Sequence, residues 1–427
     1  MARKMKDSGI EWIGEIPEGW EIKYFVQLFS QVKNKNIGLR EKNLLSLSYG
    51  KIKQKSIETV GGLLPDNFEG YNIIDRNDIV LRLTDLQNDQ HSLRVGLSHE
   101  RGIITSAYCS IRVRGAESPN YLYYYLHTFD IAKGFYGMGS GVRQGLNWDG
   151  LKYIKILLPP QHEQDRISVF LNQKTLEIDS MLSKTISSIE EYKKLKQAVI
   201  TQAVTKGVRG EREMKDSGVE WIGEIPKEWS TPKIKRLHNG LTDGTHGTFN
   251  RIDSGHILLS SKNVREFGIQ LGENESFISE ADYNLITANG FPQKDDVLLC
   301  CIGASIGRCT LYEFEEAMAF QRSVIFIRCN SLILPRMMMY DLRSSNTLLQ
   351  EQLLVNQSAQ AGLYQGLVSE IFISLPPISE QKEIIAYLDA KCAEIDRLIA
   401  KKEQLVKELE SYKKSLIYEV VTGKREV

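Results

Sequence analysis

The chain has 427 residues, of which 42% are hydrophobic and 25% charged, a composition typical of soluble globular proteins. Its 54 Lys and Arg balance 54 Asp and Glu, and this zero net charge argues against a chain coated with charge for binding polyanions without help. There is no apolar run of about 18 residues and no signal-peptide pattern at the start, so we expect roughly two to four folded units in a cytoplasmic protein.

Neither a metal site nor a disulfide framework is expected. The six cysteines have no Cys-x-x-Cys spacing, and five of them fall in the second half of the chain. The seven histidines have no paired spacing that would suit a metal or nucleophilic catalysis. We therefore interpret both residue types as structural.

One phrase occurs twice. Residues 5–20 (MKDSGIEWIGEIPEGW) and 214–229 (MKDSGVEWIGEIPKEW) agree at 13 of 16 positions. A second shared segment follows in each half, because ILLPP at 156–160 corresponds to ISLPP at 373–377, and Glu-Gln follows both. The chain is therefore a tandem duplication, which predicts a pseudo-twofold molecule whose halves present similar surfaces.

Each half ends in a segment with helical periodicity. Apolar residues recur at spacings of three, four and seven over 171–203, and again at equivalent places over 388–420. Two prolines precede each segment, and Gly207 and Gly423 follow, as helix start and stop signals do. A helix over 163–205 would be on the order of 64 Å long, and it needs a partner for its apolar stripe.

The simplest partner is the other copy, packed antiparallel. Lys196 and its counterpart Lys413 interrupt the two stripes at the same place, and polar residues in a helical seam fix register and orientation. The alternative is that each helix packs onto its own domain, as amphipathic helices ordinarily do.

The regions between these segments, 21–155 and 230–372, have the pattern of mixed α/β domains. Strand-like runs occur at 78–83 and 296–301, and helices are expected to start near Pro119 and Pro335, because proline suits the first turn. The predicted fold class is therefore mixed α/β, with two globular domains and two long helices in an internal repeat.

The combination of MKDSG-x-EW-I-G-E-I-P opening each half and LPP-x-x-EQ leading into a long helix resembles the specificity subunit of type I restriction-modification systems. The resemblance covers nearly the whole chain. It implies two target-recognition domains that read two halves of a gapped DNA sequence, separated by spacer helices in an antiparallel coiled coil. It also implies double-stranded DNA, two DNA methyltransferase subunits and motor-nuclease restriction subunits as partners, and no membrane.

On this resemblance we divide the chain into four parts. The first recognition domain, with its repeat phrase, is expected over 1–158 and the first spacer helix over 159–207. The second repeat phrase and recognition domain are expected over 208–375, and the second spacer helix over 376–427.

The sequence lacks the motifs of a catalytic subunit. Leu158 and Leu375 precede the Pro-Pro pairs, where the adenine-methyltransferase signature requires Asp or Asn, and neither Gly-Lys pair lies in a phosphate-binding loop. We expect no catalytic residue and no cofactor on this chain, with S-adenosylmethionine, ATP and Mg²⁺ on partner subunits only. The alternative is a coiled-coil scaffold that assembles partner enzymes without reading sequence; an enzyme in its own right is a third, weaker possibility.

The first half is the stronger electrostatic candidate for DNA, since residues 21–155 contain 18 Lys and Arg against 13 Asp and Glu, whereas 230–372 contain 12 against 15. The segment from residue 33 to residue 55 contains seven basic residues and only one acidic residue, Glu41. The predicted DNA contacts here are Lys33, Lys35, Asn36, Lys51, Lys53 and Lys55. A solvated loop surface is the alternative reading of such a charge run.

In the second half, TDGTHG at 242–247 resembles a loop near the start of many recognition domains of this family. The candidate DNA contacts are Thr242, Asp243, Thr245 and His246, with Lys262, Asn263, Gln321 and Arg322 as further candidates. Ordinary turn chemistry is the alternative for the last four. The loops that precede the two Pro-Pro segments add Arg143, Gln144, Asn147, Gln357, Gln360 and Tyr364, where a purely structural role is equally open.

Overall fold

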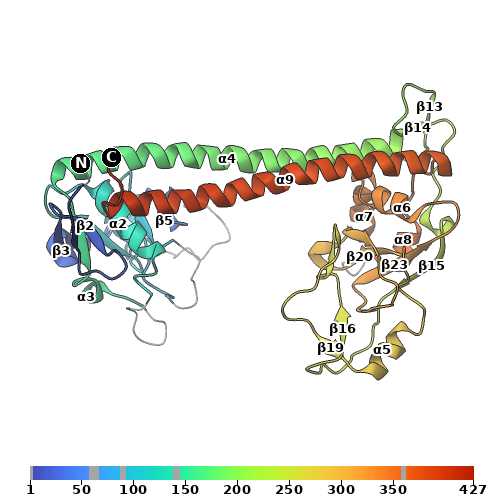
Figure 1. Cartoon of the computed structure of the whole chain (residues 1–427), viewed down its shortest axis with the longest axis horizontal. Helices are drawn as coiled ribbons and strands as arrows, with labels where there is room; N and C mark the ends of the chain where they lie inside the picture. The colour runs from blue at the N-terminus through green and yellow to red at the C-terminus, as the bar shows by residue number, and fades with distance from the viewer. Residues whose placement is uncertain (1–2, 57–66, 87–92, 137, 139–144, 357–361) are drawn as a thin grey trace. The chain divides into compact units, whose positions relative to one another are not determined.

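The computed structural model describes residues 3–427 except 57–66, 87–92, 137, 139–144 and 357–361. The chain divides into two compact units, residues 1–185 with 404–427 and residues 186–403. Each unit contains one α/β domain and parts of two long helices, α4 (Gln161–Lys206) and α9 (Ile378–Val421). Helix α4 runs from the first unit into the second, and α9 runs back (Figure 1).

Each domain is built on a four-stranded antiparallel sheet. The strand order in the first is β4 (Phe29–Gln31), β11 (Cys109–Val113), β8 (Ile79–Leu81), β9 (Val95–Leu97), and in the second β15 (His238–Asp243), β23 (Val324–Cys329), β20 (Val297–Cys300), β21 (Cys309–Leu311). Every residue of β8 and β20 is buried, as in strands covered on both faces. These are the two strands predicted at 78–83 and 296–301, and both sheets have the same order, so the domains share a fold.

Shorter elements complete the domains. The first has α1 (Phe25–Leu28), α2 (Pro119–Ile131), α3 (Trp148–Leu151), and strands β1 (Met5–Asp7), β2 (Glu15–Pro17), β3 (Glu21–Tyr24), β5 (Leu45–Ser48), β6 (Lys51–Gln54), β7 (Asn72–Ile74), β10 (Gly102–Ile104) and β12 (Lys155–Leu158). The second has α5 (Glu280–Thr287), α6 (Pro335–Leu342), α7 (Ser345–Asn356), α8 (Gln365–Ser369), the 3-10 turns η1 (Ile234–Arg236) and η2 (Gly303–Ser305), and strands β13 (Met214–Asp216), β14 (Glu224–Pro226), β16 (His256–Leu259), β17 (Val264–Arg265), β18 (Gly268–Ile269), β19 (Phe277–Ile278) and β22 (Ala319–Phe320).

The two helices predicted from Pro119 and Pro335 are α2 and α6. Both have proline in the first turn, and Ser118 caps α2 by accepting a hydrogen bond from the Tyr121 amide. Their apolar faces enter the domain cores, because Tyr121 and Met338 are fully buried there. Each helix thus joins its sheet to the long helices that pack against the same core.

The long helices pair antiparallel through equivalent ion pairs. In the first unit Lys413 Nζ lies 2.5 Å from Asp179 Oδ1, and in the second Lys196 Nζ lies 2.7 Å from Asp396 Oδ1. Moving 17 residues forward along α4, from 179 to 196, moves 17 residues back along α9, so both ion pairs obey one antiparallel register. The predicted polar interruptions of the seam are therefore its cross-links.

The repeated phrase folds into a cap over the start of a long helix. In the second unit, Trp229 Nε1 donates to Glu380 Oε2 at 3.0 Å, and Arg212 lies 2.6 Å from the other oxygen of this buried carboxylate. In the first unit, Trp20 and Arg3 make the same contacts to the carboxylate of Glu163 at 3.0 and 2.6 Å. The Glu of LPP-x-x-EQ is therefore the acceptor that fixes the tryptophan of the repeated phrase.

The Gln of the same motif joins the long helix to the helix of the domain. Gln164 accepts from the Ser118 amide at 2.9 Å and donates to the Pro159 carbonyl at 2.9 Å. Gln381 repeats this arrangement with the Leu334 amide and the Pro376 carbonyl. Both glutamines are buried, so each amide satisfies backbone groups that would otherwise be orphaned at a helix start.

The fold class predicted from the sequence is confirmed: two mixed α/β domains, two long helices in antiparallel pairing and an internal repeat. The predicted helix over 163–205 is α4, which extends slightly beyond both ends of that range. The predicted domain limits at 158, 207 and 375 fall next to the ends of the long helices, and they stay predictions.

Replacing Glu380 by Ala should destabilise the second unit by about 3–5 kcal/mol, because it leaves Arg212 and the Trp229 indole without their buried acceptor. The measurement is the midpoint of chemical unfolding. The matched control is Glu383→Ala, whose exposed carboxylate pairs with Arg209 at 2.8 Å, and little change is expected there. Equal effects of the two substitutions would contradict the capping role of Glu380.

Candidate nucleic-acid interface

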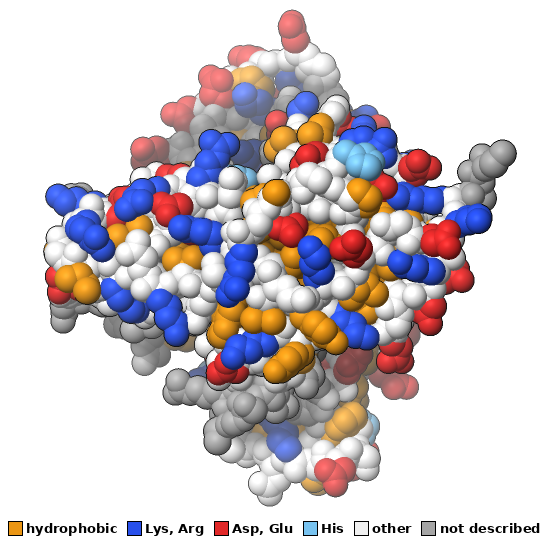
Figure 2. All heavy atoms as spheres, turned by 90° about the vertical axis from the view of Figure 1, so that its left-hand side faces the viewer, with side chains coloured by type: hydrophobic (Ala, Val, Ile, Leu, Met, Phe, Trp, Pro, Cys, Tyr) orange, Lys and Arg blue, Asp and Glu red, His pale blue; other side chains and the backbone are white. Residues whose placement is uncertain are grey.

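The basic stretch predicted between residues 33 and 55 lies on two segments of the first domain. Residues 33–36 follow β4, whereas residues 51–55 form β6 and the position after it. Lys33, Lys53 and Lys55 are exposed, and none has an ion-pair partner among the described residues. Figure 2 shows a face over which Lys and Arg side chains are spread among apolar and uncharged groups, with Asp and Glu side chains between them.

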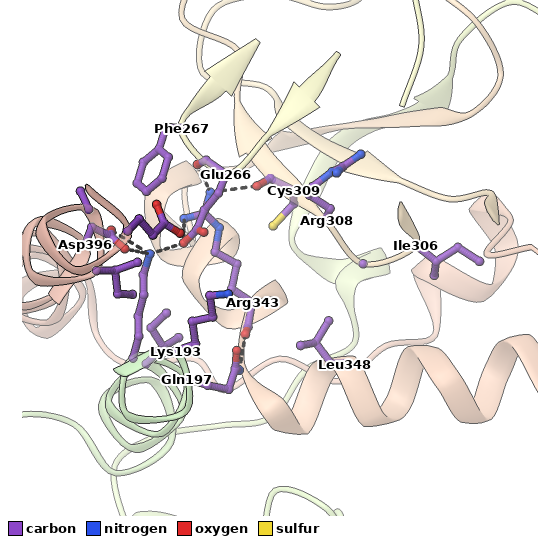
Figure 3. A pocket seen from close by; sticks show the side chains of 16 residues that line it. Lys193, Gln197, Glu266, Phe267, Ile306, Arg308, Cys309, Arg343, Leu348 and Asp396 are labelled. Atoms are coloured by element: carbon purple, nitrogen blue, oxygen red, sulfur yellow. Dashed lines mark hydrogen bonds and ion pairs between the residues drawn. The ribbon is translucent and has the colours of Figure 1, made fainter. Parts of the chain in front are cut away.

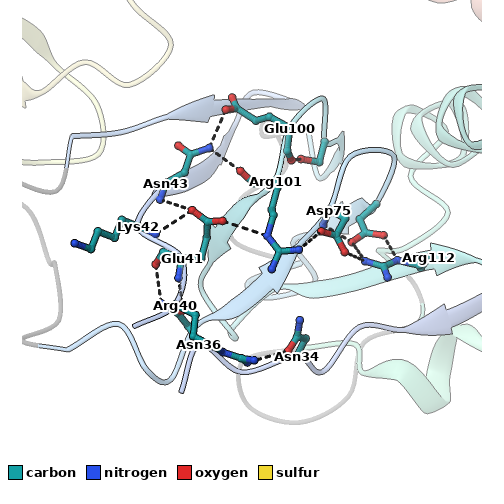
Figure 4. Close-up of polar contacts among 12 residues, drawn as sticks. Asn34, Asn36, Arg40, Glu41, Lys42, Asn43, Asp75, Glu100, Arg101 and Arg112 are labelled. Carbon is teal, nitrogen blue, oxygen red and sulfur yellow. Dashed lines mark hydrogen bonds and ion pairs between the residues drawn. The ribbon is translucent and has the colours of Figure 1, made fainter. Parts of the chain in front are cut away.

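Asn36 does not belong to this exposed set. It is fully buried, its side chain donates to the Glu41 carbonyl at 2.9 Å, and it accepts from the Glu41 amide at 3.0 Å. The Asn43 amide donates to the Glu41 carboxylate, and this bond and an ion pair with Arg101 hold the pKa of Glu41 below its usual value. Arg101 also forms an ion pair with Asp75 (Figure 4), so a polar network fixes the turn that follows Asn36. The prediction of Asn36 as a DNA contact is wrong, because its side chain is buried.

Two of the predicted lysines bind within the protein. Lys35 donates to the Gly70 carbonyl at 2.7 Å, and Lys51 Nζ lies 2.9 Å from Asp179 on α4. Each charge is thereby partly committed, which leaves Lys33, Lys53 and Lys55 as the lysines best placed to meet a polyanion.

Of the candidates predicted in the loops before the long helices, Asn147 and Tyr364 lie within the described residues. Asn147 is exposed, and its side chain caps α3 by accepting from the Gly150 amide at 3.2 Å. Four further candidates lie outside the described residues: Arg143, Gln144, Gln357 and Gln360.

In the second domain, β15 leads from Thr242 and Asp243 into the predicted loop, where Asp243 is the central residue. Its carboxylate accepts from Gln365 Nε2 at 2.6 Å and lies 2.7 Å from His246 Nε2. Thr245 accepts from the Gly247 amide at 3.2 Å, which closes the turn. The His246 side chain stays exposed, so the loop presents an imidazole and a hydroxyl on a preformed backbone.

Gly244 lets this loop approach the neighbouring strand. A Cβ at that position would lie 2.3 Å from the Gln321 carbonyl oxygen and 2.4 Å from that of Phe320. Beside the loop lies a cavity of about 440 Å³ whose apolar lining consists of four phenylalanines and two aliphatic residues: Phe249, Phe291, Phe320, Phe326, Leu285 and Ile286. The polar loop therefore stands on an apolar base that packing holds in place.

Three predicted segments meet at this loop. Thr245 pairs with Gln321 in a parallel β-bridge, and the Arg322 amide donates to the Thr245 carbonyl at 3.0 Å. The Ser261 amide donates to Ser323 Oγ at 3.0 Å, which brings residues 260–262 beside 321–323. Arg322 is exposed and Gln321 is half-buried, so both side chains reach the surface.

Lys262 and Asn263 have different roles. Lys262 is exposed and lies 2.9 Å from Glu275. Asn263 is buried, accepts from the Ser260 amide at 3.1 Å and donates to Gln270 and Glu275. The prediction of Asn263 as a DNA contact is therefore wrong, and the turn chemistry considered as its alternative is what the structure has.

Gln365 was missed by the sequence reasoning. It begins α8, directly after the exposed candidate Tyr364, and its amide is the partner of Asp243. A glutamine at the end of a loop already singled out as polar is a weak signal. The pairing of residues 122 positions apart could be found only in the folded chain.

The candidate surfaces of the two domains occupy equivalent places with different chemistry. Ile111 of β11 pairs with Gln31, and Ile327 of β23 pairs with Leu241. Ile111 and Ile327 hold equivalent places in the two sheets, so their partners Gln31 and Leu241 are also equivalent. Two residues further along each strand, Lys33 is therefore equivalent to Asp243. An exposed lysine therefore stands in one domain where the other has an aspartate that is bonded to Gln365 and His246, so these equivalent positions differ in charge and in exposure.

Comparison with known proteins agrees with this architecture. Residues 258–409 match the family described as the type I restriction modification DNA specificity domain. The chain resembles type I specificity subunits. It is 26% identical over 423 residues to the type I restriction enzyme MjaVIII specificity subunit of Methanocaldococcus jannaschii, covering 96% of this chain and 93% of that one. The putative MjaX specificity subunit of the same organism is 25% identical, with coverage of 96% and 95%.

The fold is also found among solved structures. One of them is a chain from a type I R-M system, solved to explain the structural basis of its complex assembly and conformational transition. It superposes on this chain with a TM-score of 0.70. The two chains are 15% identical, and their alignment covers 96% of this chain and 99% of the other. The likeness extends to both domains and both long helices.

The described residues contain neither of two other kinds of feature. None of their helices is long and apolar enough to cross a membrane. Within the same residues, no cluster of three His, Cys, Asp or Glu side chains has the arrangement of a metal site.

Replacing Gly244 by Ala should displace the loop from the strand at Gln321 and cost about 1–3 kcal/mol of stability, because the new Cβ meets backbone atoms. Gly247→Ala is the control, since the nearest atoms to its Cβ would belong to the movable ring of Phe249, at 2.8 Å, rather than to the backbone. Thermal unfolding and DNA binding of both variants are the measurements. A Gly244→Ala protein indistinguishable from the control in both would contradict the close-approach argument.

Proposed function

We propose that this chain is a non-catalytic DNA-recognition subunit that reads a two-part, gapped target. In this proposal it directs methyltransferase and restriction subunits to that target in the cytoplasm. S-adenosylmethionine, ATP and Mg²⁺ would act on the partner subunits. The names of its relatives, which call those proteins specificity subunits of type I restriction enzymes, support the recognition role.

The observation that carries the proposal is that both halves repeat the same caps, sheets and long helices, which together we call the frame. The polar surfaces at equivalent positions of this frame differ. The caps at Glu163 and Glu380 are nearly identical, and so are the sheet orders. In contrast, Lys33 in one domain stands where Asp243 stands in the other. A molecule that repeats its frame while varying one surface is suited to recognising two different short sequences at a set separation.

The long helices offer a surface for partner subunits. Val169 and Leu176 of α4 are exposed to 67% and 70%, and their spacing of seven places them on one face of the helix. Exposed apolar side chains in helical register favour the docking of another helix, so we assign this face to a protein partner.

A scaffold that assembles enzymes without reading sequence is the second candidate. The zero net charge favours it, and so does the engagement of Lys51 and Lys262 with acidic groups of the protein itself. The two candidates differ in whether complex formation confers a sequence preference.

The test is to express the chain with its cognate methyltransferase subunit and map methylated adenines across a host genome. A methyltransferase expressed without this chain is the control. We expect a gapped, two-part motif that appears only when the chain is present. A complex that marks adenines without sequence preference would support the scaffold instead, and failure to form a complex would contradict both candidates.

Replacing Lys53 and Lys55 together by Ala should weaken DNA binding and reduce the slope of log affinity against log salt by about 2, since each phosphate contact contributes about 0.9. Lys6→Ala, an exposed lysine on β1, is the control. Binding of labelled DNA at several salt concentrations measures the slope. An unchanged slope would move the DNA surface away from β6.

A further inference from the structure

In addition to the contacts that α2 and α6 make, each domain reaches the long helices through one hairpin. In the first domain this is the β5–β6 hairpin, residues 45–54, which packs beside β9. In the second it is the β17–β18 hairpin, residues 264–269, which packs beside β21. Because β9 and β21 hold the same position in their sheets, the two hairpins are equivalent.

The hairpins reach the same feature of the helices. Lys51, at the start of β6, lies 2.9 Å from Asp179, whose other oxygen binds Lys413. Glu266, in the turn between β17 and β18, binds Lys196, whose ammonium also binds both oxygens of Asp396 at 2.7 and 2.8 Å. Each Lys–Asp pair of the long helices is thus a three-residue cluster whose third member comes from a domain.

The two third members have opposite charges. Lys51 binds the aspartate of its cluster, whereas Glu266 binds the lysine of its own. A Lys–Asp pair presents one cation and one anion side by side, so it offers a partner to a hairpin residue of either sign. Two domains with divergent surfaces are therefore attached to one duplicated frame.

The second contact is held from several sides. Lys196 is buried, and Phe267 lies over its ammonium group at 5.1 Å. Arg343, at the end of α6, donates to the Glu266 carbonyl at 2.6 Å and accepts from Gln197 of α4 at its own carbonyl. Figure 3 shows these side chains converging around one pocket from the hairpin, α6 and both long helices.

The hairpins also carry or adjoin the candidate DNA contacts. Lys53 and Lys55 follow Lys51 on the same strand and its extension, and the β17–β18 hairpin directly follows the segment 260–263. A tether at Lys51 or Glu266 therefore fixes the strand or loop that faces the ligand.

We propose that Lys51 and Glu266 are positioning residues that dock each recognition domain on a Lys–Asp pair of the spacer helices, and that this pair accepts a hairpin residue of either charge. The inference rests on the proposed function where it concerns DNA. It assigns to Lys51 the role of orienting the domain, in place of the phosphate contact predicted from the sequence.

The first test needs no DNA. Amide hydrogen exchange of residues 45–54 is measured in the full chain carrying Lys51→Ala or Lys51→Glu, with Lys53→Glu as the matched control on the same strand. We expect exchange to be about two- to fivefold faster in Lys51→Ala, since one exposed ion pair is lost. It should return toward the wild-type rate in Lys51→Glu, because a glutamate can bind Lys413 as Glu266 binds Lys196. The control should exchange like the wild type.

Unchanged exchange in Lys51→Ala, or exchange in Lys51→Glu as fast as in Lys51→Ala, would overturn the proposal. The mirrored pair Glu266→Ala and Glu266→Lys, followed over residues 264–269, tests the second cluster in the same way. These outcomes do not depend on whether the chain reads DNA, so they separate this inference from the proposed function.

The second test uses the complex with the methyltransferase and the target found by genome mapping. DNA with the natural spacer is compared with DNA whose spacer is longer or shorter by one base pair. Lys51→Ala should narrow the difference in methylation rate between these DNAs without changing the half-sites, and Lys51→Glu should restore it. If Lys51 is instead a phosphate contact, Lys51→Glu will bind less tightly than Lys51→Ala at every spacer length, and the proposal fails.

Discussion

The pairing of a lysine with an aspartate across the helical seam is the interaction on which the rest of the structure depends. It occurs twice, as Lys196 with Asp396 and as Lys413 with Asp179. Burying a lysine such as Lys196 is costly unless an acid meets it, so only a register that brings lysine and aspartate together is acceptable. Apolar stripes alone would tolerate a shift by one heptad, whereas these pairs do not. Burial alone would raise the pKa of Asp179, but the hydrogen bonds from Lys413 and Lys51 outweigh it and hold that pKa below its usual value, which favours the ionised carboxylate.

Once that register is set, each repeated phrase packs where one long helix begins and the other ends. Each folds over the start of one long helix through the bond from tryptophan to glutamate. It also packs against the glycine that ends the other helix, since a Cβ at Gly423 would lie 3.1 Å from Trp20 and one at Gly207 3.2 Å from Trp229. Both glycines have positive φ, 72° and 76°, which suits a helix stop. The phrase is repeated because the same junction is built twice.

The two surfaces that would meet DNA are under no such constraint. They lie beyond the sheets, where a change of side chain alters the ligand that is favoured without disturbing the frame. Lys33 and Asp243 illustrate the freedom, because equivalent backbone positions carry opposite charges. The fixed and the variable parts meet at Lys51 and Glu266, where each domain reaches the ion pair of the helices.

The sequence by itself determined the duplication, the long helices, their antiparallel pairing, the central strands β8 and β20, and the starts of α2 and α6. These follow from local periodicity, proline and glycine signals, and comparison of the halves. Only the tertiary structure decided which polar residues face outward. Asn36 and Asn263 have the side chains of a base-reading surface, yet they are buried, while Gln365 joined the site from 122 residues away. Composition and spacing report what a side chain can bind, but the partner it finds depends on which distant segments pack beside it, and that is fixed only when the chain folds.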